Sequence, residues 1–178
     1  MPASDSRPVP DAADLREGVP VHDALLALLP LVGVWRGTGA GVVASTGAEF
    51  RYGQQLRFVH DGRPFLVYEA RSWLLAEDGS VLRQAWRESG FWRPGAGPDD
   101  VEVILASNTG QAMQYAGVAG DQRWELTSAS VVPSATAKHI DGERRLYAIV
   151  GAELVYATEL APAGAPYSAH LNARLARS

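Results

Sequence analysis

The chain has no cysteine among its 178 residues. Disulfide bonds, thiolate ligands for a metal and cysteine nucleophiles are therefore excluded. The lack of disulfides also removes the usual framework of a small secreted domain, so we expect a cytoplasmic protein.

Lysine and long apolar runs are also scarce. Fifteen arginines accompany a single lysine, Lys138, and the formal net charge is −4, which gives no electrostatic support for a nucleic-acid partner. The longest apolar run, Ala24 to Val34, contains Pro30 and is shorter than the roughly 18 residues that a membrane-spanning helix needs. We therefore expect neither a nucleic-acid nor a membrane partner.

The first 20 residues contain four prolines and lack the basic start and apolar block of a signal peptide. We interpret residues 1–20 as a mobile N-terminal tail and residues 21–178 as one folded domain, a size that suits a single core.

A short leucine-rich helix, capped by Asp23 and ending near Pro30, precedes a long region of alternating apolar and polar residues. Turn signals such as Asp78-Gly79 interrupt this region, and Asp141-Gly142 is interpreted as another turn, between strands 137–140 and 144–150. About ten strands joined by tight turns predict an all-β fold. We expect an antiparallel up-and-down barrel, calycin-like, with one short N-terminal helix, since closure leaves no exposed sheet edge.

Glycines alternate along the first predicted strand, where Gly33, Gly37 and Gly39 share one face with a single large residue, Trp35. Glycine weakens a strand, so the row needs a reason, either sharp coiling of the barrel or the close approach of a flat ligand. The structural interpretation is favoured, with Trp35 filling the barrel floor beneath the helix and its indole N–H seeking an acceptor.

The Gly-x-Trp-x-Gly-x-Gly pattern after a leucine helix resembles the nitrobindin family of haem-binding β-barrels, which are also described as peroxynitrite isomerases. The resemblance runs from Ala24 to Arg177. It includes Arg63-Pro64-Phe65-Leu66-Val67-Tyr68, the segment from Pro133 to Lys138 and a terminal His170-Leu171 strand.

The resemblance implies a bound haem b with His170 as the axial ligand of its iron and with Thr46 and Lys138 contacting the haem. It implies isomerisation of peroxynitrite to nitrate at ferric iron and binding of nitric oxide at ferrous iron. The partners would be these small molecules. Three arginines are alternative sources of positive charge that the sequence does not rank: Arg57, Arg144 and Arg145.

The four histidines show no spacing typical of a zinc site. We expect His22 and His60 to be solvated. In the last strand Leu171, Ala173 and Leu175 form the apolar face, so strict alternation points His170 outward. Either a β-bulge that redirects the histidine or a wide cavity with a polar wall would resolve this conflict, and both remain open.

Two other classes of function are compatible with such a barrel. One is a lipocalin-like or fatty-acid-binding-like carrier of a small apolar ligand without catalysis, in which His170 is incidental and an interior arginine meets a carboxylate. The other is an interaction module. No Ser-His-Asp grouping or paired acid motif indicates a hydrolase.

Overall fold

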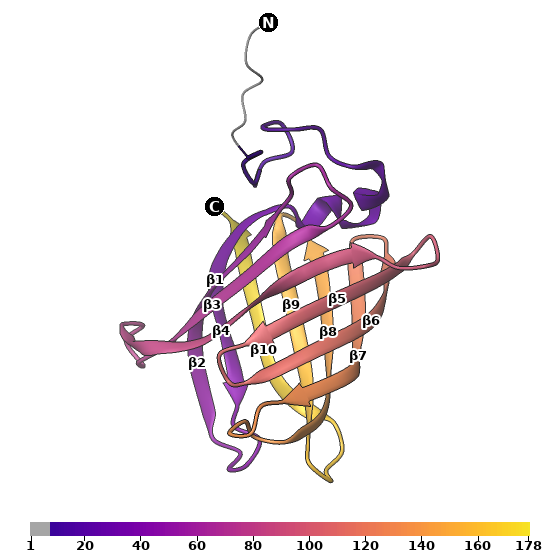
Figure 1. The fold of residues 1–178 in the computed structure, drawn as a ribbon. Coiled ribbons are helices and arrows are strands. Elements are labelled where there is room, and N and C mark those ends of the chain that lie inside the picture. Colours follow the sequence, from indigo (N-terminus) through magenta and orange to yellow (C-terminus); the bar gives the residue numbers. More distant parts are fainter. Residues whose placement is uncertain (1–7) are drawn as a thin grey trace, which may run out of the picture.

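Each strand pairs antiparallel with the next strand in sequence, and β1 pairs with β10, which closes the barrel (Figure 1). The computed structural model describes residues 8–178. The prediction of a ten-stranded up-and-down barrel with one short helix is confirmed. The strands are β1 (Gly33–Val42), β2 (Glu49–Val59), β3 (Leu66–Leu75), β4 (Val81–Pro94), β5 (Asp100–Ser107), β6 (Gln111–Gly120), β7 (Arg123–Pro133), β8 (Ile140–Val150), β9 (Glu153–Pro162) and β10 (Ser168–Arg177).

The helix, η1 (Asp23–Leu31), is a 3₁₀ helix that covers one end of the barrel (Figure 1). Leu25, Leu28 and Leu31 are buried, and their spacing of three matches the three residues per turn of a 3₁₀ helix. The predicted cap is wrong by one residue. His22 is the N-cap, because its Nδ1 accepts a hydrogen bond from the backbone N–H of Ala24.

Trp35 lies in the barrel floor beneath η1, as predicted. Its side chain is buried, and its indole N–H donates to the carbonyl oxygen of Leu31 at 2.8 Å. The guanidinium of Arg177 stacks over the indole ring, 4.2 Å from its centroid. Trp35 therefore joins the helix to the first and last strands of the barrel.

The alternating glycines of β1 make room for neighbouring protein groups. A Cβ added at Gly37 would overlap the carbonyl oxygen of Arg174 in β10, and one at Gly39 would overlap the ring of Tyr52. Gly41 faces the ring of Phe50 in the same way. The close approach of β1 to β10 agrees with the expected coiling of the barrel. The rings of Tyr52 and Phe50 fill the space beside Gly39 and Gly41, which leaves no room there for a flat ligand.

Gly37→Ala should lower the free energy of unfolding by about 1–3 kcal/mol, because the added methyl group overlaps backbone rather than a movable side chain. Chemical denaturation monitored by tryptophan fluorescence measures the change. Gly120→Ala is the matched control, since the nearest atom to its added Cβ lies at 3.8 Å. Equal stability of the two variants would contradict a steric role for Gly37.

Asp141-Gly142 is not a turn, contrary to the prediction. Strand β8 runs through both residues, and a register shift against β9 between Ile140 and Gly142 absorbs the irregularity. The carboxylate of Asp141 accepts a hydrogen bond from the backbone N–H of Gly164. The connection between β7 and β8 occupies residues 134–139 instead.

Part of the predicted tail contacts the barrel. Ala12 forms an antiparallel bridge with His60, which follows β2, and His60 is buried, so its predicted solvation is wrong. The chain segment around Ala12 covers this histidine. Residues 1–7 of the predicted tail lie outside the described residues. None of the helices formed by residues 8–178 has the length and apolar character needed to cross a membrane.

Candidate functional site

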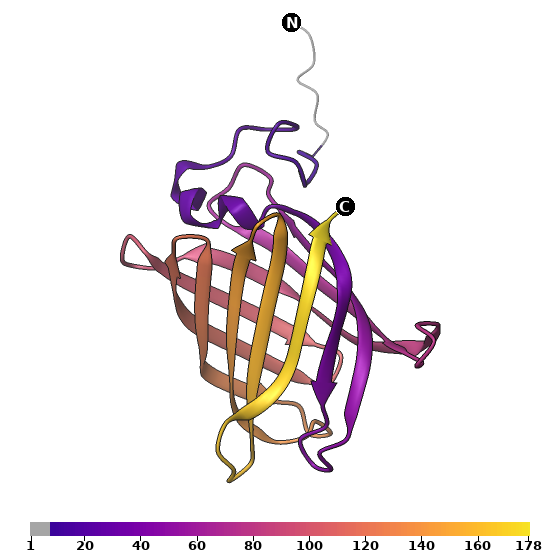
Figure 2. The ribbon, with the colours of Figure 1, turned by 180° about the vertical axis from the view of Figure 1, so that it is seen from behind.

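A pocket of about 480 Å³ lies at the end of the barrel opposite η1. Strands β1 and β10 run side by side from the helix end to the opposite end of the barrel, as Figure 2 shows, and residues of both strands line the pocket there. The apolar part of its wall consists of Phe50, Leu74, Leu75, Leu82 and Leu171. Other lining positions come from the ends of β1, β2 and β3 and from the β10 segment 169–172.

His170 reaches this pocket through a β-bulge. Ala169 pairs with Glu159 and Leu171 pairs with Thr158, which leaves His170 as an extra residue on β10. The bulge lets Leu171 point inward while the half-buried His170 also lines the pocket. Of the two arrangements that the sequence left open, the structure contains the bulge.

The imidazole of His170 is held by one hydrogen bond. Its Nδ1 lies 2.9 Å from the carbonyl oxygen of Val42, the last residue of β1. A carbonyl oxygen only accepts, so Nδ1 carries a proton, and in the neutral imidazole Nε2 then keeps its lone pair. Metal-binding histidines have this tautomer when a backbone carbonyl accepts from the other ring nitrogen.

Charged side chains stand at the rim of the pocket, where Glu49, Arg51 and Glu77 are among the lining residues. The guanidinium of Arg51 contacts the carbonyl oxygen of Glu77 at 3.5 Å, and it forms no ion pair within residues 8–178. An apolar wall, a histidine with a free nitrogen lone pair and a cation at the rim fit a flat apolar metal complex with anionic edge groups, such as haem.

The other two predicted ligand-contacting residues do not line the pocket. Thr46 lies in the exposed β1–β2 loop next to it, where its Oγ1 accepts a hydrogen bond from the backbone N–H of Ala48. Lys138 is exposed on the β7–β8 connection, and its carbonyl oxygen accepts from the side-chain amide of Gln111. His170 and Arg51 line one pocket, and Lys138 is not among its lining residues.

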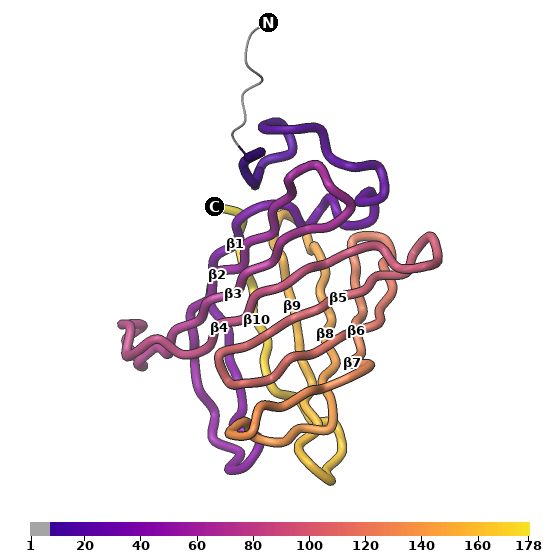
Figure 3. The backbone as a smooth tube through the Cα atoms, viewed as in Figure 1, coloured from indigo at the N-terminus to yellow at the C-terminus, as the bar shows by residue number. Residues whose placement is uncertain are grey.

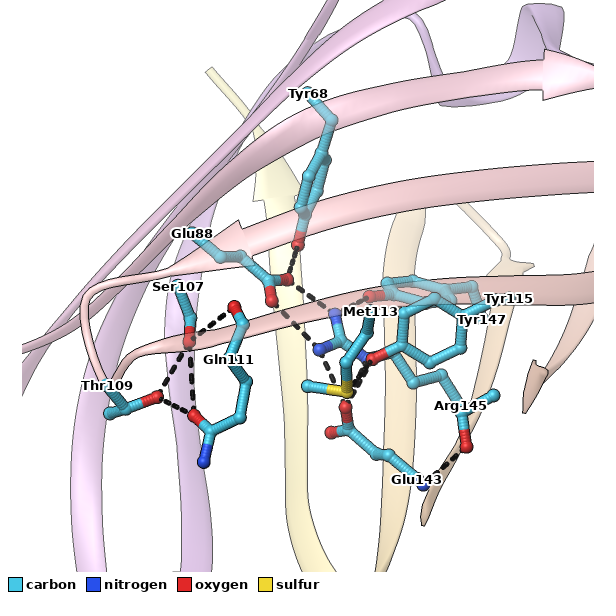
Figure 4. A network of polar contacts seen from close by, with 11 residues as sticks. Tyr68, Glu88, Ser107, Thr109, Gln111, Met113, Tyr115, Glu143, Arg145 and Tyr147 are labelled. Atoms are coloured by element: carbon cyan, nitrogen blue, oxygen red, sulfur yellow. Dashed lines mark hydrogen bonds and ion pairs between the residues drawn. The ribbon is translucent and has the colours of Figure 1, made fainter. Parts of the chain in front are cut away.

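A buried ionic cluster fills the barrel interior behind the pocket (Figure 4). The guanidinium of Arg145 binds both carboxylate oxygens of Glu88, at 2.5 and 2.9 Å, and it also binds Glu143 at 2.8 Å. Tyr68 donates to Glu88 at 3.0 Å, and Tyr115 donates to Glu143 at 2.5 Å. All five side chains are buried, so they form one continuous polar core.

This cluster bears on the interpretation of the protein as a carrier in which an interior arginine binds the carboxylate of a fatty acid. Arg145, the interior arginine, already binds two carboxylates, and the cavity beside the cluster has a volume of about 10 Å³, which is room for about one water molecule. Arg57 and Arg144 lie near other carboxylates, those of Glu69 and Glu159. Within residues 8–178, the cavity beside Arg145 has no room for a fatty acid, and Arg145 itself is already paired with two carboxylates.

Comparison with known proteins agrees with this geometry. Residues 24–177 match the family model of the THAP4-like, haem-binding β-barrel domain. The protein named peroxynitrite isomerase of Salinispora arenicola is 42% identical, over 99% of this chain and 91% of its own length. Peroxynitrite isomerase 1 of Mycobacterium ulcerans is also 42% identical, over 99% of this chain and 95% of its own.

A solved structure shows the same fold. The crystal structure of Rv2717c from M. tuberculosis matches with a TM-score of 0.78 and 33% sequence identity, covering 89% of this chain and 99% of that one. The chain belongs to the THAP4-like haem-binding β-barrel family, the nitrobindin family that its motifs predict.

Proposed function

We propose that this chain binds haem b through Nε2 of His170 and isomerises peroxynitrite to nitrate at the haem iron. The observation that carries the proposal is the bulge that brings His170 into the pocket with Nδ1 bonded to Val42. The names of relatives 42% identical over almost the whole chain support the same activity. The cavity beside the buried ionic cluster, about 10 Å³, is too small for a fatty acid, which favours the haem site over a ligand carried in the barrel core.

The residues around the pocket have different roles in such a haem site. Val42 fixes the plane of the His170 imidazole and raises its basicity as a ligand. Phe50, Leu74 and Leu171 give the pocket an apolar wall. Bound haem supplies an iron centre that takes up peroxynitrite when ferric and nitric oxide when ferrous.

Reconstitution with haem tests the proposal. The loaded protein should show a strong Soret band, and stopped-flow mixing with peroxynitrite should show decay faster than in buffer, with nitrate as the product. Haem-free protein is the control for decay caused by the polypeptide alone. If the loaded and haem-free proteins consume peroxynitrite at the same rate, the isomerase proposal fails.

Arg51 is the cation that the structure places at the pocket rim, so we expect it to pair with a haem propionate. Arg51→Gln should weaken haem binding about 2- to 5-fold, the range for an exposed ion pair, and added salt should reduce the difference. Haem titration followed by absorbance gives the affinity of each variant.

Lys138→Gln is the matched comparison, because the family resemblance assigns the haem contact to Lys138. The structure predicts that this change leaves haem affinity unaltered. A larger loss of haem affinity in Lys138→Gln than in Arg51→Gln would mean that Lys138, and not Arg51, contacts the haem propionate.

A further inference from the structure

Five oxidisable rings form a continuous row through the barrel, and the proposed function gives none of them a role. In order from the pocket they are Tyr52, Tyr156, Tyr147, Trp92 and Tyr68. Every one of these side chains is at least nine-tenths buried. Figure 3 shows the strands that carry them on opposite walls of the barrel, so the row crosses its interior.

Tyr52 begins the row at the pocket wall. Its hydroxyl donates to the carbonyl oxygen of Asn172, a pocket-lining residue, at 3.0 Å. Its ring lies 6.1 Å from the ring of Phe50, another lining residue. With Tyr52 donating to Asn172, Tyr156 is the donor in the contact between the two hydroxyls, whose oxygens are 2.6 Å apart, and the side-chain oxygen of Gln54 is a second acceptor within reach of the same proton. The first two rings are therefore coupled directly by one hydrogen bond.

The remaining rings continue at short separations. The centroids of Tyr156 and Tyr147 are 5.4 Å apart, those of Tyr147 and Trp92 are 5.2 Å apart, and those of Trp92 and Tyr68 are 6.2 Å apart. Electron transfer between aromatic side chains is fast at such separations, because electronic coupling decays exponentially with distance. No ring in the row stands away from its neighbours.

Tyr68, which lines one small cavity together with Tyr147 and Tyr156, has a built-in proton acceptor. A tyrosine that loses an electron becomes a strong acid and must pass its phenolic proton to a base. Tyr68 already donates to Glu88, and burial raises the pKa of Glu88, which makes this carboxylate a better base. Figure 4 shows the Tyr68 hydroxyl directed at that carboxylate. Trp92 has no partner for its buried N–H within residues 8–178, so an oxidised Trp92 would have no neighbouring base for its proton.

We propose that these five residues, the tyrosine relay, deliver single electrons to the pocket, with Tyr68 as the terminal donor and Glu88 as the acceptor of its proton. The inference rests on the proposed function, which supplies a peroxide-class oxidant. When the O–O bond of that oxidant breaks homolytically and nitrogen dioxide escapes, a one-electron oxidising equivalent remains in the pocket. One electron then leaves Tyr68 through the relay and its proton moves to Glu88, which leaves a neutral tyrosyl radical and a protonated carboxyl group, while the oxygen left in the pocket takes up the electron and two protons from solvent and leaves as water.

Freeze-quench electron paramagnetic resonance of the haem-loaded protein, mixed with hydrogen peroxide, tests the relay. The wild type should give a tyrosyl radical signal. Tyr156→Phe interrupts the row and should reduce the radical yield several-fold. Tyr167→Phe is the matched control, because Tyr167 stacks with Arg144 outside the row and its loss should leave the yield unchanged.

Two further variants separate the relay from a structural role. Tyr68→Phe should change the hyperfine pattern of the radical, since the radical must rest on another tyrosine. Glu88→Gln keeps the shape of the side chain and should lower the radical yield while the Soret band persists. Tyr68→Phe keeps the ring and leaves the Glu88–Arg145 ion pair in place, so this variant keeps the inference testable if Tyr156→Phe folds poorly.

The outcomes distinguish the relay from the proposed function. A normal Soret band with the same radical yield and spectrum in wild type, Tyr156→Phe and Tyr68→Phe overturns the relay alone. Absence of a Soret band in the wild type removes the electron acceptor and overturns both. A lower yield in Tyr156→Phe with an unchanged yield in Tyr167→Phe supports the relay.

Discussion

Arg145→Met should destabilise the barrel by about 3–5 kcal/mol at neutral pH, which is the usual cost of breaking a buried ion pair by removing one partner. Arg145 binds Glu88 and Glu143, and all three side chains are buried. Without the guanidinium, two carboxylates remain close together in the core with no cation. Chemical denaturation followed by tryptophan fluorescence measures the loss.

The effect of Arg145→Met should depend on pH. Burial already raises the pKa of Glu88 in the wild type, and the attraction of Arg145 opposes that rise. Removing Arg145 raises the pKa further, so the folded state binds protons more tightly than the unfolded state. Such a group contributes stability below its unfolded pKa and loses it as pH rises through the folded pKa. The variant should therefore be least destabilised in acid and most destabilised above neutral pH.

Arg174→Met is the matched control for this prediction. Arg174 pairs with Glu153 at 2.5 Å on the exposed surface, where an ion pair contributes less than about 1 kcal/mol. A combined replacement of Arg145, Glu88 and Glu143 by apolar residues of similar volume should restore much of the lost stability. An equal loss for Arg145→Met and Arg174→Met would show that the buried cluster is not what stabilises the core.

His170→Ala should abolish the wild-type Soret spectrum and weaken haem binding by more than about 100-fold, because loss of a ligand exceeds the 10- to 100-fold effect of losing a residue that only orients one. The apolar wall of the pocket remains, so weak haem adsorption should persist. Absorbance titration with haem measures both changes. Added imidazole should partly restore the spectrum by entering the space of the missing side chain.

His139→Ala is the control for His170→Ala. His139 is an exposed histidine beside Asp141, and its replacement should leave haem affinity unchanged. If His170→Ala keeps the wild-type spectrum and affinity, the iron ligand is another residue and the proposed function loses its central contact.

Local sequence signals were sufficient to predict the barrel. Alternation of apolar residues predicted the strands, and dipeptides such as Asp78-Gly79 predicted the hairpins, because both signals depend only on neighbouring residues. The turn predicted at Asp141-Gly142 was wrong because this prediction also depended only on neighbouring residues. The dipeptide has the composition of a turn, but pairing with β9, which is distant in sequence, keeps both residues in β8.

The site was harder to predict, since it depends on a register that sequence alone does not fix. The resemblance pointed to His170, but its direction required the bulge opposite Glu159 and Thr158. The ionic cluster was missed because Glu143 and Arg145 alternate like solvent-facing residues of a strand. The presence of Tyr147 two positions further on the same face was the available signal that this polar face points inward.

The two described ends of the chain and the pocket lie at opposite poles of the barrel. The backbone N–H of the last residue, Ser178, donates to Val34 near η1, and the segment around Ala12 meets the same region (Figure 1). Attachment of the protein to a solid support or to a second protein through Ser178 should therefore leave the pocket mouth facing solution. A sensor film tethered at this end should keep ligand access.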